Sequence, residues 1–174
     1  MNLSETITLD QLTKSEYGSR KNVKEQFAPD EIIVKKLTAL CVNLLQPLKD
    51  KLTELYPGCT FRFTSGYRCK VVNDAAGGAD SSQHLAGEAS DNELVINGKE
   101  ENAIIAKTLL DLGIDFDQMI LEYGTMEHPD WIHLSWDLDK PKQRRMILRV
   151  DYDKAGNKRQ YLITENVVKA IKTI

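Results

Sequence analysis

The sequence predicts an α+β protein with a mostly antiparallel sheet flanked by helices. Apolar residues recur at helical spacing between residues 33 and 55, whereas short alternating segments typical of strands occupy much of the rest of the chain. These segments do not alternate regularly, as they would in a parallel βαβ fold. With 174 residues, 41% of them hydrophobic and 28% charged, the chain is expected to form one domain over residues 1–174.

The N-terminal part is expected to be helical. Residues 8–26 have the character of short helical turns, for which Thr8 and Thr13 are candidate N-caps. A long helix is expected to begin near residues 29–31, Pro-Asp-Glu, because proline suits the first helical turn and acidic residues favour that end.

Seven apolar residues at helical spacing predict the buried stripe of this long helix: Ile33, Leu37, Leu40, Leu44, Leu48, Leu52 and Leu55. Pro47 should kink or interrupt the helix, and the Pro-Gly pair at 57–58 should end it. The alternating residues 60–64 then predict a first strand.

The middle of the chain contains a long polar segment. Residues 65–90 are glycine-rich and too many for an ordinary connection, and long ordered loops are often functional. A short strand is expected at residues 93–96. A helix is expected over residues 100–112, with Gly113 placed to terminate it.

The C-terminal part is expected to add strands to the sheet. Residues 118–123 and 131–136 are expected to form two paired strands. Residues 145–152 and 159–163 are expected to form a hairpin around the turn at 154–157. Thr164 is then expected to cap a last helix over residues 165–173.

Charge and cysteine content exclude several classes of protein. The net charge of −3 gives no general attraction to nucleic acid, and no apolar run is long enough to insert into a membrane. The N-terminus resembles no signal peptide, so synthesis in the cytoplasm is expected, and a monomer is assumed. Cys41, Cys59 and Cys69 are odd in number and lack C-x-x-C spacing, so we expect reduced thiols, with Cys41 and Cys69 in the core. The basic run at 140–145 is interpreted as a solvated face.

Two histidines and an aspartate are candidate metal ligands. His84 precedes Asp91 by seven positions, and Gly87 between them suggests a loop that bends before it enters a strand near Asp91. His133 lies in an alternating segment, on the same face as Trp131. Two imidazoles and a carboxylate would leave one coordination position of a metal open to water, and a further carboxylate could take that water's proton.

The residues alone leave other interpretations open. A histidine within a strand is more often a hydrogen-bonded core residue than a ligand, so spacing by itself does not decide between a metal site and a structural role. Two histidines and a carboxylate also suit the iron of non-haem oxygenases. In that class, however, the histidine and the acid are usually two positions apart.

Several segments resemble one family of zinc peptidases. The run Ser82-x-His84-x-x-Gly87-x-Ala89-x-Asp91 resembles the S-x-H-x-x-G-x-A-x-D signature of the D-alanyl-D-alanine carboxypeptidase group, whose fold also occurs in the signalling domain of hedgehog proteins. Three further segments are similar to family motifs: residues 65–68 with Asn73, residues 117–122 and residues 131–135. The resemblance covers roughly residues 8–150, and its N-terminal half resembles phage-type peptidoglycan peptidases.

The resemblance implies a hedgehog/DD-peptidase fold and a Zn²⁺ ion held by His84, Asp91 and His133. It also implies that Arg68 binds a carboxylate or carbonyl of the substrate, a role that suits the planar guanidinium group. The alternative for Arg68 is a structural ion pair within the loop.

The resemblance assigns the remaining site residues less directly. Ser82 and Asn73 would hold the loop or form hydrogen bonds to substrate, although Ser82 could equally be a turn residue. Many relatives place an acid three residues before the second histidine, and here that residue is Asp130, the expected catalytic base. Strict alternation would put Asp130 and His133 on opposite faces, so Glu122, at the end of the neighbouring strand, is the alternative.

The function implied is that of a zinc metallopeptidase acting on peptidoglycan stem peptides. It would be an L-Ala–D-Glu endopeptidase or a D-Ala carboxypeptidase. A chain without a signal peptide would fit an endolysin-like lytic protein of phage or prophage type that reaches the wall after release. The alternative is a non-catalytic, zinc-containing module that binds wall peptide or a protein partner.

Overall fold

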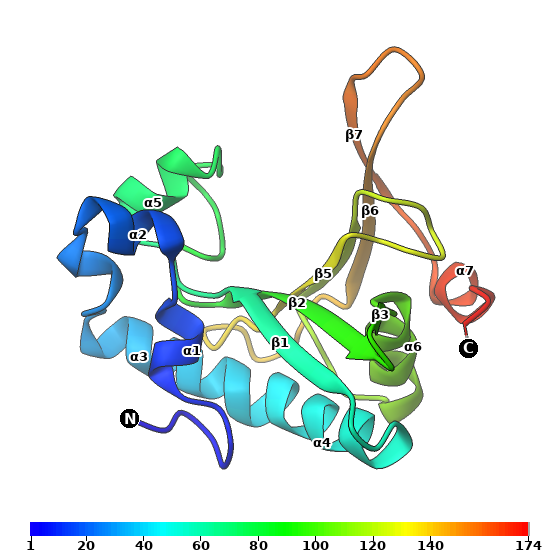
Figure 1. Ribbon diagram of the computed structural model, residues 1–174, viewed down its shortest axis with the longest axis horizontal. Coiled ribbons are helices and arrows are strands. Elements are labelled where there is room, and N and C mark those ends of the chain that lie inside the picture. The colour runs from blue at the N-terminus through cyan, green and yellow to red at the C-terminus, as the bar shows by residue number, and fades with distance from the viewer. Residues whose placement is uncertain (174) are drawn as a thin grey trace.

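Seven strands form one sheet in the computed structural model, which describes residues 1–173 (Figure 1). The strands are β1 Thr60–Ser65, β2 Ala89–Ile96, β3 Lys99–Glu100, β4 Gln118–Glu122, β5 Trp131–Ser135, β6 Met146–Tyr152 and β7 Lys158–Leu162. Their order is β1-β2-β5-β4-β6-β7, with β3 paired to β2. Every pair is antiparallel except β4 with β6. The predicted mostly antiparallel sheet flanked by helices is therefore confirmed.

The helices lie around this sheet. They are α1 Leu9–Thr13, α2 Glu16–Lys21, α3 Glu31–Leu40, α4 Gln46–Leu55, α5 Lys70–Ala75, α6 Ala103–Leu112 and α7 Glu165–Lys169, with a 3₁₀ turn at Lys24–Gln26. A π-helical turn, Cys41–Leu45, joins α3 to α4, and Pro47 follows it in the first turn of α4. The predicted interruption at Pro47 thus takes the form of a π turn. Within residues 1–173 no helix combines the length and apolarity needed to cross a bilayer.

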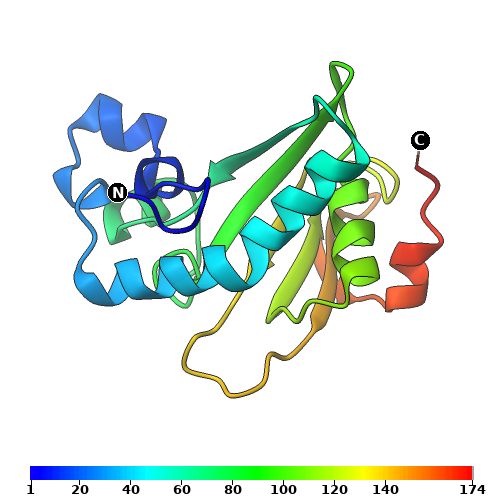
Figure 2. The ribbon, with the colours of Figure 1, turned by 90° about the horizontal axis from the view of Figure 1, so that it is seen from below.

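The main core lies between one face of the sheet and the helices. Figure 2 shows the continuous helix formed by α3 and α4 running along this face, with α6 beside it. Five leucines of the predicted stripe are fully buried: Leu37, Leu40, Leu44, Leu48 and Leu52. Leu55 is 48% exposed, so the stripe ends one turn earlier than expected. Cys41 and Cys69 are buried, as predicted.

Several predicted caps are confirmed, and one is corrected. Thr8 forms a capping box at the start of α1, Gly113 adopts a left-handed conformation after α6, and Thr164 caps α7. Ser15 caps α2 in place of Thr13, whose hydroxyl instead donates to a carbonyl within α1. The last helix ends at Lys169 rather than at residue 173.

The middle of the chain differs most from expectation. The predicted loop at 65–90 contains α5, and β2 begins at Ala89 rather than at residue 93. The earlier start places Asp91 inside a strand, where its backbone pairs with β5. The expected helix at 100–112 begins at Ala103, because β3 precedes it.

Candidate active site

Strand register brings the candidate site residues to one face of the sheet. Asp91 in β2 lies directly opposite His133 in β5, and Ile120 in β4 lies opposite His133 on its other side. Side chains two residues apart on a strand point to the same face, so Glu122 shares this face with Ile120. The face is the one turned away from the main core, since Ile132 and Leu134 of β5 belong to that core.

The two histidines and Asp91 lie within contact distance of one another. Asp91 Oδ1 is 3.2 Å from His84 Nε2 and 3.1 Å from His133 Nδ1, and all three residues are buried. The two imidazole rings are 5.0 Å apart at an angle of 74°. One potential ligand atom from each residue lies within 4.8 Å of the others. The donor set and its spacing fit a single metal ion of the zinc type.

The backbone fixes which nitrogen of His84 faces Asp91. His84 Nδ1 lies 2.6 Å from the carbonyl oxygen of Gly66, so Nδ1 carries a proton and donates it. In the neutral ring, Nε2 is then an acceptor that faces another acceptor, Asp91 Oδ1. Two acceptors at this distance need a cation between them, either a proton or a metal ion. A backbone carbonyl that orients a histidine in this way is typical of metal sites.

Charge is concentrated on Asp91. Burial raises the pKa of this carboxyl, but the two imidazoles, through charge and hydrogen bonding, outweigh burial and hold the pKa well below its usual range. Asp91 is therefore a carboxylate, the form that binds a metal.

Arg68 occupies the second oxygen of Asp91. Its guanidinium lies 2.6 Å from Asp91 Oδ2, and its Nε donates to Ser65 Oγ at 2.7 Å. This ion pair leaves Oδ1 as the oxygen that faces the histidines. Arg68 also lines the cleft described below, so its expected contact with substrate and its structural ion pair are compatible.

A cleft of about 720 Å³ opens over this group of residues. Its lining comes from the 76–84 loop, from β2, β4 and β5, and from β7. Figure 1 shows α5 and the β6–β7 hairpin rising on the same side of the sheet, one at each end. Ser82, His84, Asp91, Glu122 and His133 all line the cleft, which is open and largely polar.

The structure separates the two candidate bases. Glu122 lines the cleft, and burial, followed by the charge of Asp91, raises the pKa of its carboxyl. Asp130 is exposed, does not line the cleft, and lies in the turn just before β5. Because Asp130 directly precedes Trp131, whose side chain is on the cleft face, strand alternation directs Asp130 away from that face. The geometry thus favours Glu122 over the expected Asp130.

Ser82 and Asn73 have different surroundings. Ser82 lines the cleft, and its hydroxyl accepts a 3.3 Å hydrogen bond from the backbone N–H of His84. Asn73 is fully buried outside the cleft and donates to the carbonyl of Ala79 at 3.1 Å. A side chain at Gly78 would collide with Asn73, since a Cβ there would be 2.3 Å from its Oδ1. Asn73 therefore holds the loop.

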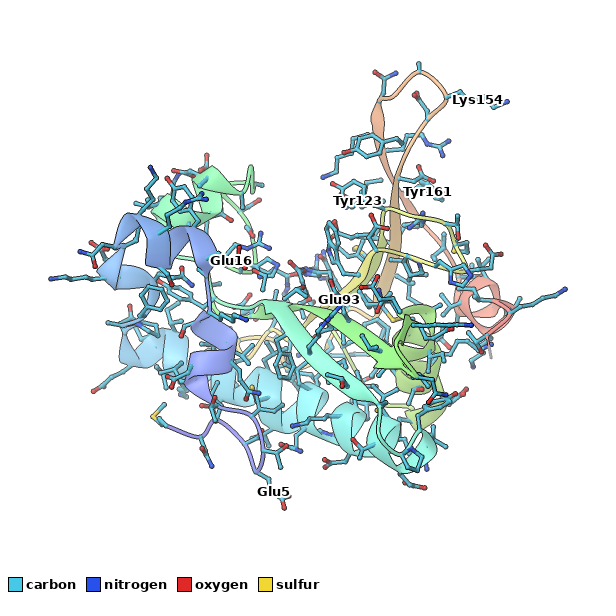
Figure 3. The ribbon with its side chains drawn as sticks, in the orientation of Figure 1. Glu5, Glu16, Glu93, Tyr123, Lys154 and Tyr161 are labelled. Atoms are coloured by element: carbon cyan, nitrogen blue, oxygen red, sulfur yellow. The ribbon has the colours of Figure 1, made fainter. Side chains whose placement is uncertain are left out.

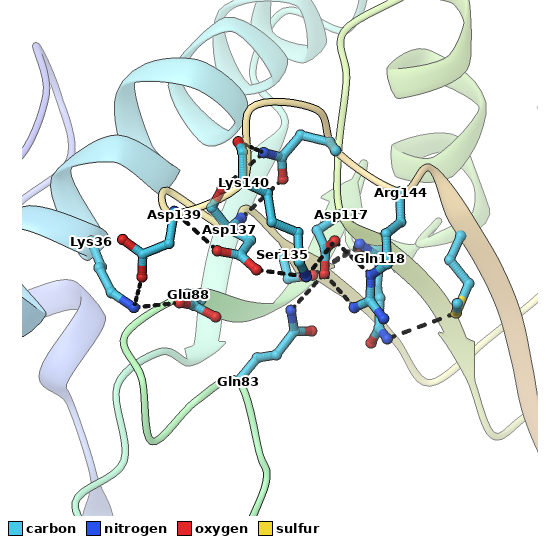
Figure 4. Close-up of polar contacts among 12 residues, drawn as sticks. Lys36, Gln83, Glu88, Asp117, Gln118, Ser135, Asp137, Asp139, Lys140 and Arg144 are labelled. Carbon is cyan, nitrogen blue, oxygen red and sulfur yellow. Dashed lines mark hydrogen bonds and ion pairs between the residues drawn. The ribbon is translucent and has the colours of Figure 1, made fainter.

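A polar network that the sequence analysis missed anchors the segment before His84. Gln83 donates to the fully buried Asp117 at 2.8 Å, and Arg144 donates to the same carboxylate through two nitrogens (Figure 4). Arg144 also lines the cleft. The basic run at 140–145 is thus more than a solvated face. Its composition could not reveal this role, because the partner Asp117 is distant in sequence.

A second group of acids has a structural explanation. Glu88, Asp137 and Asp139 also lie within 4.8 Å of one another. Lys36 places its ammonium 2.7 Å from Glu88 and 2.7 Å from Asp139, and Lys140 pairs with Asp137 at 2.6 Å (Figure 4). The lysines already supply the positive charge that a metal ion would bring.

A sheet face that gathers two imidazoles, a carboxylate and a half-buried glutamate in an open cleft defines a site suited to metal-dependent hydrolysis. The family model described as Peptidase M15 matches residues 7–135, and the chain belongs to that family of metal-dependent peptidases. The motif resemblance is supported at this level. No curated protein matches the chain.

Proposed function

We propose that the chain is a zinc metallopeptidase that hydrolyses amide bonds in peptidoglycan stem peptides. The observation that carries this proposal is the pair of imidazoles that face the same oxygen, Asp91 Oδ1, with the ring of His84 oriented by the contact of its Nδ1 with the Gly66 carbonyl. Membership of the Peptidase M15 family supports the peptidase chemistry. The proposal includes a hedgehog-type fold and a single peptidase domain over residues 1–174.

His84, Asp91 and His133 would hold the ion, with a fourth position open to the cleft. We favour zinc because two imidazoles and one carboxylate are a common catalytic zinc set. A bound zinc ion would lower the pKa of a water molecule and polarise the scissile carbonyl. Metal analysis showing iron instead would favour the oxygenase alternative.

The protein's own residues then handle the proton and orient the substrate. Glu122, which lines the cleft, would accept a proton from the attacking water and return it to the leaving amine. The pKa of Glu122 is raised, mainly by burial. A higher pKa makes a carboxylate a stronger base, which favours its use as a general base near neutral pH. Arg68 and Ser82, which both line the cleft, would position the peptide through hydrogen bonds.

Peptidoglycan stem peptides are the substrate class we favour. The phage-type motif resemblance points to them, and an open polar cleft suits an extended peptide that carries carboxylates. The bond cut would be L-Ala–D-Glu or the bond to a terminal D-Ala.

The test is a digest of peptidoglycan fragments with zinc-loaded protein, analysed by mass spectrometry beside Glu122→Gln. A new amine on D-Glu would establish an endopeptidase, and released D-Ala a carboxypeptidase. Intact fragments, with one zinc bound per chain, would contradict the catalytic proposal and favour a binding module.

A further inference from the structure

The family match ends at residue 135, yet the cleft is completed by residues beyond it. Arg144, Lys158 and Gln160 all line the cleft. Two of them belong to β7, the outer strand of the β6–β7 hairpin that projects from the sheet (Figure 1). This hairpin therefore adds a wall to the cleft from outside the matched region.

Strand register explains why β7 reaches the cleft. Glu122 of β4 lies opposite Val150 of β6, and Val150 in turn lies opposite Gln160 of β7. Tyr152, two residues after Val150, lies opposite Lys158, which is two residues before Gln160. Since alternate residues share a face, Lys158 and Gln160 point to the same side of the sheet as Glu122.

Three aromatic rings lie next to one another on the cleft side of the hairpin, and Lys158 contacts one of them. The ring of Tyr123 lies 5.1 Å from that of Trp131 and stacks on Tyr152 at 5.3 Å. Lys158 Nζ lies 5.7 Å from the centre of the Tyr123 ring, a cation–π contact. Tyr123 has a φ of 52°, a conformation that is uncommon for a bulky residue and often found at functional sites. Figure 3 shows Tyr123 at the base of the hairpin.

Charge pairing distinguishes Lys158 from the other basic residues of the cleft. Arg68 is paired with Asp91, and Arg144 is paired with Asp117. Within residues 1–173, no carboxylate lies at ion-pair distance from Lys158, although its charge lowers the pKa of Glu122. Lys158 is thus a cleft-lining cation that has not been neutralised by the chain itself.

We propose that Lys158, beside the Tyr123 ring and with Gln160 as a neighbouring hydrogen-bond donor, forms a subsite that binds a carboxylate of the peptide substrate. The inference rests on the proposed function and names the feature of the substrate that the β6–β7 hairpin selects. The ammonium supplies the charge and the ring supplies an apolar surface for the peptide.

The test compares two synthetic stem peptides that are identical except for D-Glu with a free α-carboxylate or with a carboxamide. The values of kcat/KM are measured for the wild type, Lys158→Gln and the control Lys154→Gln. Lys154 lies at the tip of the same hairpin, away from the cleft (Figure 3). We expect the wild type and Lys154→Gln to prefer the carboxylate by about tenfold or more, as for a charge-assisted hydrogen bond, and Lys158→Gln to lose this preference.

The outcomes separate the two proposals. If the wild type cleaves both peptides equally, or Lys158→Gln slows both by the same factor, the subsite is wrong while the peptidase proposal stands. If the wild type cleaves neither peptide, the peptidase proposal fails. Binding of the same two peptides to zinc-loaded protein, measured by isothermal titration calorimetry, then decides the subsite. A carboxylate preference that Lys158→Gln removes would support it, and equal or absent binding would overturn it.

Discussion

Asp91 and His133 are directly opposed residues of the paired strands β2 and β5, and Asp91 Oδ1 lies 3.1 Å from His133 Nδ1. Their separation is thus set by backbone hydrogen bonding between strands. His84 reaches the same oxygen from the preceding loop, at 3.2 Å. The candidate ligand set is therefore held by two paired strands on one side and by a loop on the other.

Replacing either cleft histidine should abolish metal binding. We expect His84→Ala and His133→Ala to lower metal affinity by more than about 100-fold, because loss of even an outer hydrogen-bond partner costs roughly 10- to 100-fold. His128→Ala is the matched control, since this third histidine is exposed and outside the cleft. Zinc content per chain after dialysis measures the effect. Full zinc content in either cleft variant would refute the ligand assignment.

Replacing the two candidate bases should change activity to very different extents. Glu122→Gln should lower kcat by roughly 10²- to 10⁴-fold while the metal is retained, as expected for loss of a general base. Asp130→Asn should remain within a few-fold of wild type, because its side chain points away from the cleft. Steady-state kinetics with a parallel zinc assay checks both. Selective loss of activity in Asp130→Asn would restore that residue as the base.

The ion pair between the buried Asp117 and the more exposed Arg144 should make stability depend on pH in the acid range. Burial raises the pKa of Asp117, but hydrogen bonds from Arg144 and Gln83 outweigh it, so the pKa lies below its usual value. Its stabilisation is therefore present above the unfolded pKa of about 4 and is lost as the pH falls through the lower folded pKa.

Asp117→Asn should accordingly lower the free energy of unfolding by about 1–3 kcal/mol at pH 7. The difference from wild type should shrink as the pH falls below about 4. Urea unfolding at several pH values measures this. Asp115→Asn, which breaks only a surface ion pair with Arg145, should cost less than about 1 kcal/mol. An Asp117 effect that does not change with pH would rule out the carboxylate as its source.

Gly87 should tolerate no side chain. Its φ is +70°, and a Cβ would lie 2.8 Å from Ile33 Cγ2. Gly156 is the matched control. Its φ is +83°, but a Cβ there would meet no atom within 4 Å, so Gly156→Ala introduces backbone strain without a steric clash. We expect Gly156→Ala to cost about 1–2 kcal/mol and Gly87→Ala to cost more, with weaker zinc binding. Equal unfolding free energies for the two variants would mean that the contact with Ile33 is relieved without cost.

Local patterns in the sequence predicted the long helix, the hairpin and the approximate strands. The leucine stripe predicted the long helix because helical periodicity depends only on residues three and four positions apart in the sequence. The parallel pairing of β4 with β6 was not predicted, because strand order depends on how the whole sheet assembles and not on local sequence. The short α5 was hidden within a glycine-rich segment that carries little hydrophobic pattern.

The site was predictable to a different extent. The motif around His84 and Asp91 indicated the ligand candidates before any geometry was known. It favoured Asp130 as the base over Glu122, whereas the geometry favours Glu122, because that choice depends on which way a side chain points at a strand end. The cleft role of Lys158 was beyond sequence reasoning, since it follows from the pairing of two strands after the matched region.

The ligand candidates have a consequence for folding. His84 and His133 are separated in the chain by β2, β3, α6 and β4, so no short segment holds both. An ion bound between them would close a long loop and act as a reversible cross-link, favouring the native state according to its free concentration. Chelation should then lower the midpoint of thermal unfolding, and metal capture should follow the docking of β5 onto β2 rather than guide it.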